Sequence, residues 1–235
     1  MIKHWYRKLK LLVLQLLGKE PNLIVGLNYA LEFHGTVYGG WNILKDSLSQ
    51  ESVVVDLGLG EDISFSESLI DTYGCRVYGF DPTPRSIAYV NQRKNKLFFL
   101  YEYGVAAESG EAIFYLPNNA EHISGSLQSS FHLGENAISV RLIGTGELLE
   151  KIGVKSIDLL KMDVEGAEYG IINSKGFPEL VKGTKQVLIE FHHRWPGIGK
   201  SKTIEAVKKM NQMGYGLAWV SETNQEALFI RNHSV

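Results

Sequence analysis

The sequence predicts an α/β fold built on a mainly parallel sheet. The clearest observation is the stretch from Ser52 to Pro84, where a β-branched run, a glycine turn, a helical segment and a second apolar run follow one another. The two apolar runs end in carboxylates, Asp56 and Asp81. Strand, glycine turn, helix and strand in this order form the βαβ unit that binds nucleosides in Rossmann-like folds. Further strands and helices follow, and the chain ends in a predicted antiparallel hairpin.

The composition is that of an ordinary globular chain. Of its 235 residues, 44% are hydrophobic and 21% are charged, which is enough apolar material for a real core. We expect an N-terminal helical extension and flap in residues 1–45, and one main domain in residues 46–235. A formal net charge of −2 gives no general attraction to nucleic acid, so none is expected as a partner. The single cysteine, Cys75, favours a reducing, cytoplasmic compartment.

Residues 1–17 join a basic head to an apolar run that is far shorter than the roughly 20 residues of a membrane span. No small-x-small cleavage site follows, although a cleaved signal peptide stays an alternative. A helix here packs on its own domain or on a second subunit, which would make a homodimer. The other interpretation is an interfacial helix in peripheral contact with a membrane. Trp5 and Tyr6 would then lie at headgroup level, and the basic residues Lys3, Arg7, Lys8 and Lys10 would face anionic lipid.

Two aromatics enclose two glycines in Tyr38-Gly39-Gly40-Trp41. Glycines at such a turn let bulky rings come close together. Because the turn directly precedes the first strand of the βαβ unit, we expect a flap over the cofactor or substrate. A surface turn with a core tryptophan is the alternative.

The glycine turn after Asp56 contains Gly58 and Gly60. A dinucleotide site usually has a third glycine, because the helix N-terminus must face a pyrophosphate. Glu61 and Asp62 occupy that region and would repel a phosphate dianion. S-adenosylmethionine carries no phosphate, and its sulfonium and amino groups are cationic, so an acidic turn suits it better.

Asp81 follows Asp56 by 25 residues, about the interval at which an acid at the end of the second strand accepts both ribose hydroxyls. Farther along, Thr83 and Pro84 begin a helix that runs to Lys94, and a strand follows over residues 97–101. The small residues of the 103–110 segment, Val105 and Ala106 among them, would let an adenine ring approach the backbone. A short strand is expected over residues 113–116. The polar segment from residue 118 to 135 is predicted to be a substrate loop, with an ordinary surface excursion as the alternative.

Carboxylates also follow the strand predicted over residues 157–162, at Asp163, Glu165 and Glu168. Ligands of open α/β sheets bind at the carboxyl ends of the strands, and three such groups need partners such as cations, a metal or backbone N–H groups. The strand over residues 187–191 ends before His192 and His193, and a histidine there could take a proton from a hydroxyl near pH 7. A helix over residues 203–213 and a hairpin over residues 217–231 complete the chain.

Five runs of residues make the chain similar to the FkbM family of S-adenosylmethionine-dependent O-methyltransferases. They are Tyr38-Gly-Gly-Trp41, residues 56–65, Phe80-Asp-Pro-Thr-Pro84, residues 158–168 and Ile189-Glu-Phe-His192. The resemblance extends from about residue 35 to the end, and Lys161-Met-Asp-Val-Glu-Gly-Ala-Glu168 is its most specific part. It implies a seven-stranded Rossmann-like class I methyltransferase sheet, with helices on both faces and a C-terminal antiparallel hairpin.

The resemblance also implies which residues form the site. Cofactor contacts are implied at Asp56, Gly58, Gly60 and Asp81, and Asp62 stands where many members have a last glycine. Asp163 and Glu165 are implied beside the reactive methyl group, and His192 near the acceptor. His192 or Asp163 would be the base.

The expected acceptor is a hydroxyl of a sugar, a polysaccharide or a secondary metabolite. No metal is expected, and a divalent ion held by Asp163, Glu165 and His192 is the alternative. Two rival functions stay open, a nicotinamide-dependent oxidoreductase and a catalytically silent binding module.

Overall fold

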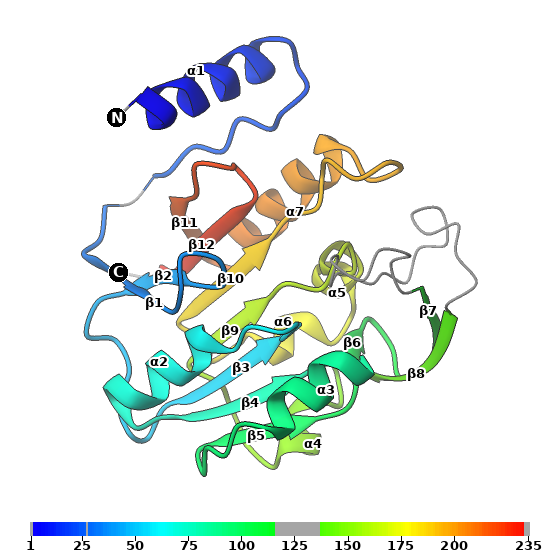
Figure 1. Cartoon of the computed structure of the whole chain (residues 1–235). Coiled ribbons are helices and arrows are strands. Elements are labelled where there is room, and N and C mark those ends of the chain that lie inside the picture. Colours follow the sequence, from blue (N-terminus) through cyan, green and yellow to red (C-terminus); the bar gives the residue numbers. More distant parts are fainter. Residues whose placement is uncertain (1, 27, 116–136, 233–235) are drawn as a thin grey trace.

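The computed structural model describes residues 2–26, 28–115 and 137–232. Its centre is a seven-stranded sheet in the order β11-β12-β10-β9-β3-β4-β5 (Figure 1). All neighbouring strands in the sheet are parallel except β12, which runs antiparallel to β10 and β11. The predicted α/β sheet with its C-terminal antiparallel hairpin is therefore confirmed. The strands are β3 (Val53–Leu57), β4 (Arg76–Phe80), β5 (Phe98–Tyr101), β9 (Leu159–Met162), β10 (Gln186–Glu190), β11 (Tyr215–Val220) and β12 (Glu226–Arg231).

Helices cover both faces of this sheet. One face packs against α4 (Leu148–Ile152), α5 (Glu168–Asn173), α6 (Phe177–Leu180) and α7 (Lys200–Gln212). The other face packs against α2 (Ser64–Tyr73), with α3 (Pro84–Asn91) beside it. Side-chain alternation along β3 divides the two cores, because Val53, Val55 and Leu57 face the first and Val54 faces the second.

Strand order reverses at β3, which pairs with β4 on one side and with β9 on the other. At such a switch point the connections leave the sheet in opposite directions, and a crevice opens at the carboxyl ends of the strands. The turn after β3 and the loop after β9 meet there.

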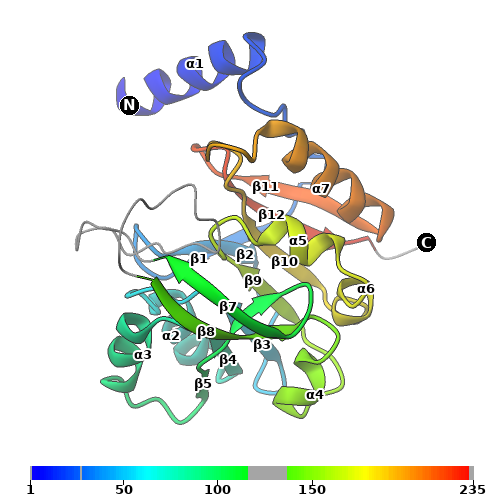
Figure 2. The ribbon, with the colours of Figure 1, turned by 90° about the vertical axis from the view of Figure 1, so that its right-hand side faces the viewer.

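Two smaller sheets were not predicted from the sequence. A ribbon of β1 (Leu31–His34) and β2 (Trp41–Leu44) places Trp41 and Ile43 in the second core. A three-stranded sheet joins β6 (Gly104–Ala106), β8 (Ala137–Gly144) and β7 (Gly110–Tyr115), and it stands at the front in Figure 2. Residues 113–115 of the strand expected over residues 113–116 form the end of β7, and residue 116 lies outside the described residues. The predicted substrate loop over residues 118–135 lies outside the described residues.

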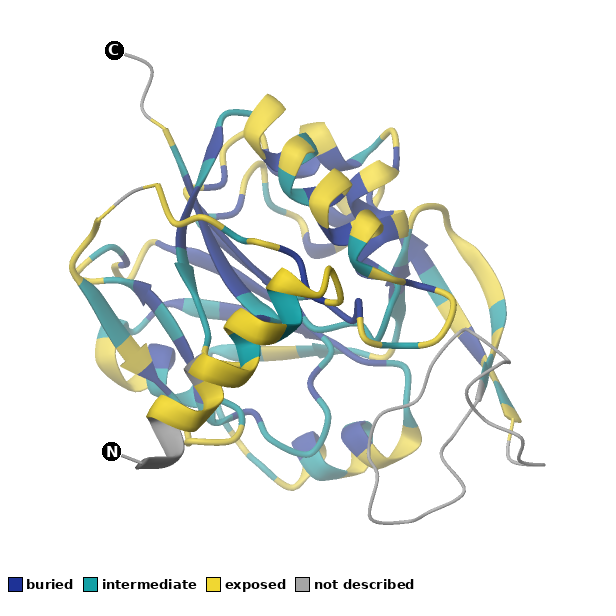
Figure 3. Cartoon of the chain, turned by 90° about the horizontal axis from the view of Figure 1, so that it is seen from above, coloured by how far each residue is buried: buried dark blue, intermediate teal, exposed yellow. Residues whose placement is uncertain are grey.

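Helix α1 (Ile2–Leu16) lies at one end of the molecule, beyond α7, β11 and β12 (Figures 1 and 2). Most of its described side chains are exposed (Figure 3). Among the described residues, no helix is both long enough and apolar enough to span a bilayer.

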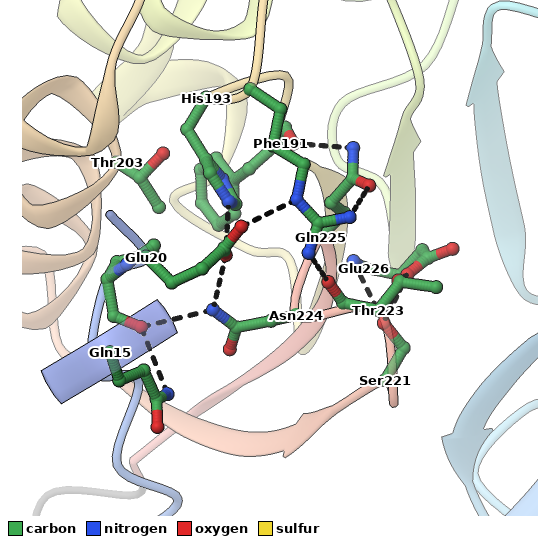
Figure 4. Close-up of polar contacts among 12 residues, drawn as sticks. Gln15, Glu20, Phe191, His193, Thr203, Ser221, Thr223, Asn224, Gln225 and Glu226 are labelled. Carbon is green, nitrogen blue, oxygen red and sulfur yellow. Dashed lines mark hydrogen bonds and ion pairs between the residues drawn. The ribbon is translucent and has the colours of Figure 1, made fainter. Parts of the chain in front are cut away.

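A buried carboxylate holds the segment after α1 in place (Figure 4). Glu20, which is 4% exposed, accepts hydrogen bonds from His193 Nε2 at 2.8 Å and Arg194 Nε at 2.6 Å. Asn224 Nδ2 donates to Glu20 Oε2 at 3.2 Å and to the Pro21 carbonyl at 3.0 Å. Burial alone would raise the pKa of Glu20, but these hydrogen bonds lower it below its ordinary value. We call these residues the Glu20 anchor.

Candidate active site

A cavity of about 420 Å³ opens at the switch point, at the carboxyl ends of β3, β4, β9 and β10. Its lining is strongly acidic. Among the described residues on its wall, seven carry carboxylates and one, Lys161, carries a cation. Carboxylates packed together favour a bound cation and disfavour a phosphate. The seven are Glu61, Asp62, Asp81, Asp163, Glu165, Glu190 and Glu226.

Asp81 lies on the wall where β4 ends, as predicted. Its Oδ2 accepts the N–H groups of Leu59 and Gly60 at 3.0 and 3.1 Å, and its Oδ1 accepts the N–H of Thr83 at 2.8 Å. Asp81 therefore holds the glycine turn in place. Thr83 Oγ1 also donates to Oδ1 at 2.6 Å, so each oxygen already accepts two hydrogen bonds, and a ligand hydroxyl would replace the rotatable Thr83 hydroxyl as a donor.

Both predicted turn glycines line the cavity with positive φ, +81° at Gly58 and +56° at Gly60. Gly58 is required by the neighbouring strand, because an added Cβ would lie 1.7 Å from the carbonyl oxygen of Asp163. The close approach joins the turn after β3 to the loop after β9, and the Asp163 N–H donates to the Leu57 carbonyl at 2.9 Å.

Asp56 lies beneath the cavity and does not reach its wall. The carboxylate is 3% exposed and accepts Lys161 Nζ at 2.9 Å and Ser66 Oγ at 2.7 Å. Lys161 also donates to the Gly58 carbonyl at 2.9 Å. Burial alone would lower the pKa of Lys161, but Asp56 and Asp163 raise it, so the amine stays charged. The placement of Asp56 supports a role in positioning the turn.

Asp62 connects the predicted flap to the glycine turn. Its Oδ2 accepts Thr36 Oγ1 at 2.7 Å, and its Oδ1 accepts the Ser64 N–H at 2.8 Å. Thr36 Oγ1 in turn accepts the Gly39 N–H at 3.0 Å, and residues 37–41 line the cavity. Burial raises the pKa of Asp62, but the hydrogen bonds from Ser64 and Thr36 outweigh it and lower the pKa. Residues 37–41 thus lie on the cavity wall beside the glycine turn, and their role as a flap stays a prediction.

Asp163 and Glu190 share the cavity with raised pKa values. Burial, with Glu165 adding to it, raises the pKa of Asp163 to about 6, although Lys161 and His192 act against the rise. Burial and the charge of Asp163 raise the pKa of Glu190 to about 9, so that carboxyl group holds a proton at neutral pH. Asp163 therefore titrates close to neutrality, as a general base should.

His192 lies behind the carboxylates, with 4% of its side chain exposed, and is not part of the cavity wall. Its Nε2 is 3.0 Å from Glu165 Oε2 and 3.9 Å from Asp163 Oδ1, and its Nδ1 is 3.2 Å from Glu168 Oε1. Burial alone would lower the pKa of His192, but Glu165 and Glu168 raise it to about 11. An imidazolium held in this way has no free lone pair with which to take a proton from an acceptor.

The same three residues form the candidate metal set. One ligand atom each from Asp163, Glu165 and His192 lies within 4.8 Å of the others. The donors suit a divalent ion. The raised pKa of His192 favours a different arrangement, in which the imidazolium itself supplies the positive charge between the carboxylates.

Of the two residues predicted beside adenine, Val105 lines the cavity and Ala106 does not. Sequence reasoning also missed three charged residues on the wall, Lys161, Glu190 and Glu226. Lys161 interrupts an apolar strand, and an interrupting lysine signals a paired, buried charge. Glu190 is the last residue of β10, and an acid at a strand end is the same signal that identified Asp81 after β4. Glu226 lies opposite Glu190 in the antiparallel pairing of β10 with β12.

The sheet order and the acidic crevice at its switch point define a Rossmann-like methyltransferase domain. The fold is similar to the crystal structure of a fibrillarin/Nop5p complex, with a TM-score of 0.50 and 12% identity over 79% of this chain and 75% of that chain. A likeness at that identity shows the fold alone. Residues 56–217 match the methyltransferase FkbM domain. The chain belongs to the FkbM methyltransferase family.

Two curated relatives match part of the chain. It is 26% identical over 151 residues to the probable methyltransferase-like protein 24 of Rattus norvegicus, covering 64% of this chain and 36% of that protein. It is 27% identical over 157 residues to the 2-O-methyltransferase NoeI of Sinorhizobium fredii, covering 60% of this chain and 63% of that protein. The chain thus spans between about a third and two thirds of the length of these relatives.

Proposed function

We propose that this chain transfers a methyl group from S-adenosylmethionine to a hydroxyl group of a sugar, a polysaccharide or a secondary metabolite. The observation that supports this most is the acidic cavity at the switch point of an FkbM methyltransferase sheet. Such a wall suits a cationic cofactor and disfavours the pyrophosphate of a nicotinamide dinucleotide.

The cavity has distinct regions that fit the parts of this cofactor. Asp81 and the glycine turn would hold the ribose, as acids at this position do in nucleoside-binding sheets. Asp163 and Glu165 would hold the cationic sulfonium and amino groups. When bound, the cofactor supplies an electrophilic methyl group. The apolar residues that could seat adenine are Phe80, Pro82, Val105, Phe114 and Leu142.

Asp163 is the proposed general base. It lies on the cavity wall with a pKa of about 6, so it is mostly ionised at neutral pH and can still accept a proton. Its backbone is fixed by the close approach of Gly58, which holds the carboxylate near the carboxyl end of β3. His192 is a positioning residue in this proposal, because its ring orients Glu165 and lies close to Asp163. The flap, held by Asp62, would exclude water.

The acceptor is proposed to be neutral, because phosphate or carboxylate groups on it would meet the same acidic wall. The similarity to NoeI, a 2-O-methyltransferase, supports transfer to oxygen.

Calorimetry with S-adenosylhomocysteine tests the cofactor. The wild-type chain should bind it, Asp81→Ala should weaken binding at least about tenfold because a hydrogen bond to a charged group is lost, and Asp71→Ala should not. Asp71 is a matched control, an exposed acid on α2 that lies outside the cavity. Absence of binding would exclude the proposal, and binding of NADH instead would support the oxidoreductase.

Methyl transfer itself separates an enzyme from a silent binding module. Glycans and secondary metabolites of the host, compared by mass spectrometry with and without the chain, should differ by the mass of one methylene group. Asp163→Asn should slow transfer about 10²- to 10⁴-fold while S-adenosylhomocysteine still binds. A chain that binds the cofactor product and modifies nothing is the silent module.

A further inference from the structure

The surface of α1 that faces away from the molecule is apolar. Seven large hydrophobic side chains between residues 5 and 17 are between 42% and 79% exposed. They recur at the three- and four-residue spacing of one helix face, and the Leu17 N–H still donates to the Val13 carbonyl at 2.9 Å. The half-buried Leu11 and Leu14 lie on the opposite side. The outward face consists of Trp5, Tyr6, Leu9, Leu12, Val13, Leu16 and Leu17.

Charge is distributed unevenly between this helix and the rest of the chain. Residues 1–19 contain five lysines and arginines and no acid, so they carry +5; since the whole chain carries −2, residues 20–235 carry −7. Lys10 is exposed and lies at the edge of the outward face, one turn from Tyr6 and Val13. Arg7 lies one turn from the half-buried Leu11, on the side of the helix that faces the domain, and its Nη1 is 3.6 Å from Glu222 Oε2. Aromatic residues at one end of an apolar stripe, with basic residues along its edge, are the features of a helix that lies in a membrane interface.

We propose that the outward face of α1 docks on an anionic lipid surface. Seven apolar side chains would enter the headgroup region, while Lys10 at the edge of the face would meet lipid phosphates. The acidic remainder of the chain would be repelled by that surface, so only the helix would contact it. A symmetric pair of chains joined through α1 is disfavoured, because it would bring two +5 segments together.

The Glu20 anchor makes this docking directional. Gln15 Nε2 donates to the Pro21 carbonyl at 3.2 Å, and Glu20 ties the segment after the helix to the loop that follows β10. The helix therefore has a fixed attachment to the domain. This loop begins at His192, next to the carboxylates of the cavity, so the docked helix would hold the cavity in a constant orientation to the surface.

Sedimentation of the full chain with vesicles tests the proposal. The chain should bind vesicles of roughly seven parts phosphatidylcholine to three parts phosphatidylglycerol at least tenfold more tightly than vesicles of phosphatidylcholine alone. Leu12→Glu/Leu16→Glu should abolish binding. Lys10→Gln should weaken it by about fivefold, since a basic residue near such a surface contributes roughly that factor. The matched control Ile204→Glu/Lys208→Glu changes exposed residues of α7 and should bind as wild type.

Quenching of tryptophan fluorescence by lipids with a spin label on the upper acyl chain gives a second readout. The quenching should be lost in Trp5→Phe, while circular dichroism confirms that each variant is folded. The proposal is overturned if neither vesicle binds, or if Leu12→Glu/Leu16→Glu binds like wild type. It is also overturned if the wild-type chain is a dimer in solution that this double variant converts to a monomer, because a second copy then covers the face.

Discussion

Thr36 Oγ1 donates a hydrogen bond to Asp62 Oδ2 at 2.7 Å, and this contact joins the flap to the glycine turn. The resemblance to the FkbM family implies a glycine at the position of Asp62. The carboxylate found there accepts hydrogen bonds from Thr36 and from the Ser64 N–H. It holds a segment that lines the cavity, since Thr36 also accepts the N–H of Gly39. The acid that departs from the family pattern thus belongs to the flap as much as to the cofactor turn.

We expect Thr36→Val to loosen the flap without unfolding the chain. The hydrogen bond lies near the surface, so its loss should weaken binding of S-adenosylhomocysteine by about three- to tenfold. Calorimetry measures the change. Thr36→Ser keeps the hydroxyl and should restore binding, and equal weakening in both variants would assign the effect to packing instead.

Lys161→Met should strongly destabilise the fold. The variant leaves Asp56 buried with only Ser66 as a partner, and removal of one member of a buried ion pair costs about 3–5 kcal/mol. Urea unfolding followed by tryptophan fluorescence measures the loss. The double variant Lys161→Met/Asp56→Asn should recover part of it, because no unpaired charge remains.

A matched surface pair gives the control for this experiment. Lys182 and Glu179 lie 3.4 Å apart on the surface, and both are more than 70% exposed. Lys182→Met should therefore change the free energy of unfolding by less than about 1 kcal/mol. A similar loss for Lys161→Met would mean that the buried pair is not needed.

Stability should fall as the pH rises from 7 to 9. His192 has a folded-state pKa of about 11 against 6.5 unfolded, and Glu190 has about 9 against 4.5. In this window the folded state holds both protons and the unfolded state has released them, so alkali favours unfolding. Each proton contributes up to about 1.4 kcal/mol per pH unit.

Urea unfolding at pH 7, 8 and 9 measures this slope. Glu190→Gln should reduce it by about half, because glutamine binds no proton in either state and the term from His192 remains. A stability that is flat over this range, or a slope unchanged in Glu190→Gln, would contradict the raised pKa values.

Chelation should leave cofactor binding unchanged. The imidazolium of His192 already places a positive charge 3.0 Å from Glu165, so the carboxylates do not require a metal. Dialysis against EDTA, followed by calorimetry with S-adenosylhomocysteine, tests this. A thermal shift produced by Mg²⁺, Mn²⁺ or Zn²⁺ that disappears in His192→Gln would show instead that the three side chains form a metal site.

Local patterns were enough to predict the main sheet. The β-branched run of β3, the left-handed Gly74 that ends α2 and the left-handed Gly153 that ends α4 each depend on neighbours in the chain. The acids Asp81 and Asp163 were found for the same reason, because each directly follows a predicted strand. These two acids of the cavity wall could therefore be read from single segments, whereas Lys161, Glu190 and Glu226 on the same wall were missed.

Contacts between distant segments could not be predicted in this way. Asp56 is paired with Lys161, 105 residues away, and this contact draws the carboxylate below the cavity. His192 is turned by Glu168, whose Oε1 accepts both its backbone N–H and its ring. Neither partner is visible in the local pattern, so the sequence places these side chains near the site but does not orient them.

The Glu20 anchor also determines where the chain can be shortened. A chain that begins at residue 19 would lose α1 and keep Glu20 with its partners His193, Arg194 and Asn224. A chain that begins at residue 23 would lack Glu20, so the buried His193 ring and the Arg194 guanidinium would both lose their carboxylate partner. His193 directly follows His192, so this loss would occur next to the cavity carboxylates. The two truncations differ by four residues. Only the first would remove the helix and leave the contacts of Glu20 with the methyltransferase domain intact.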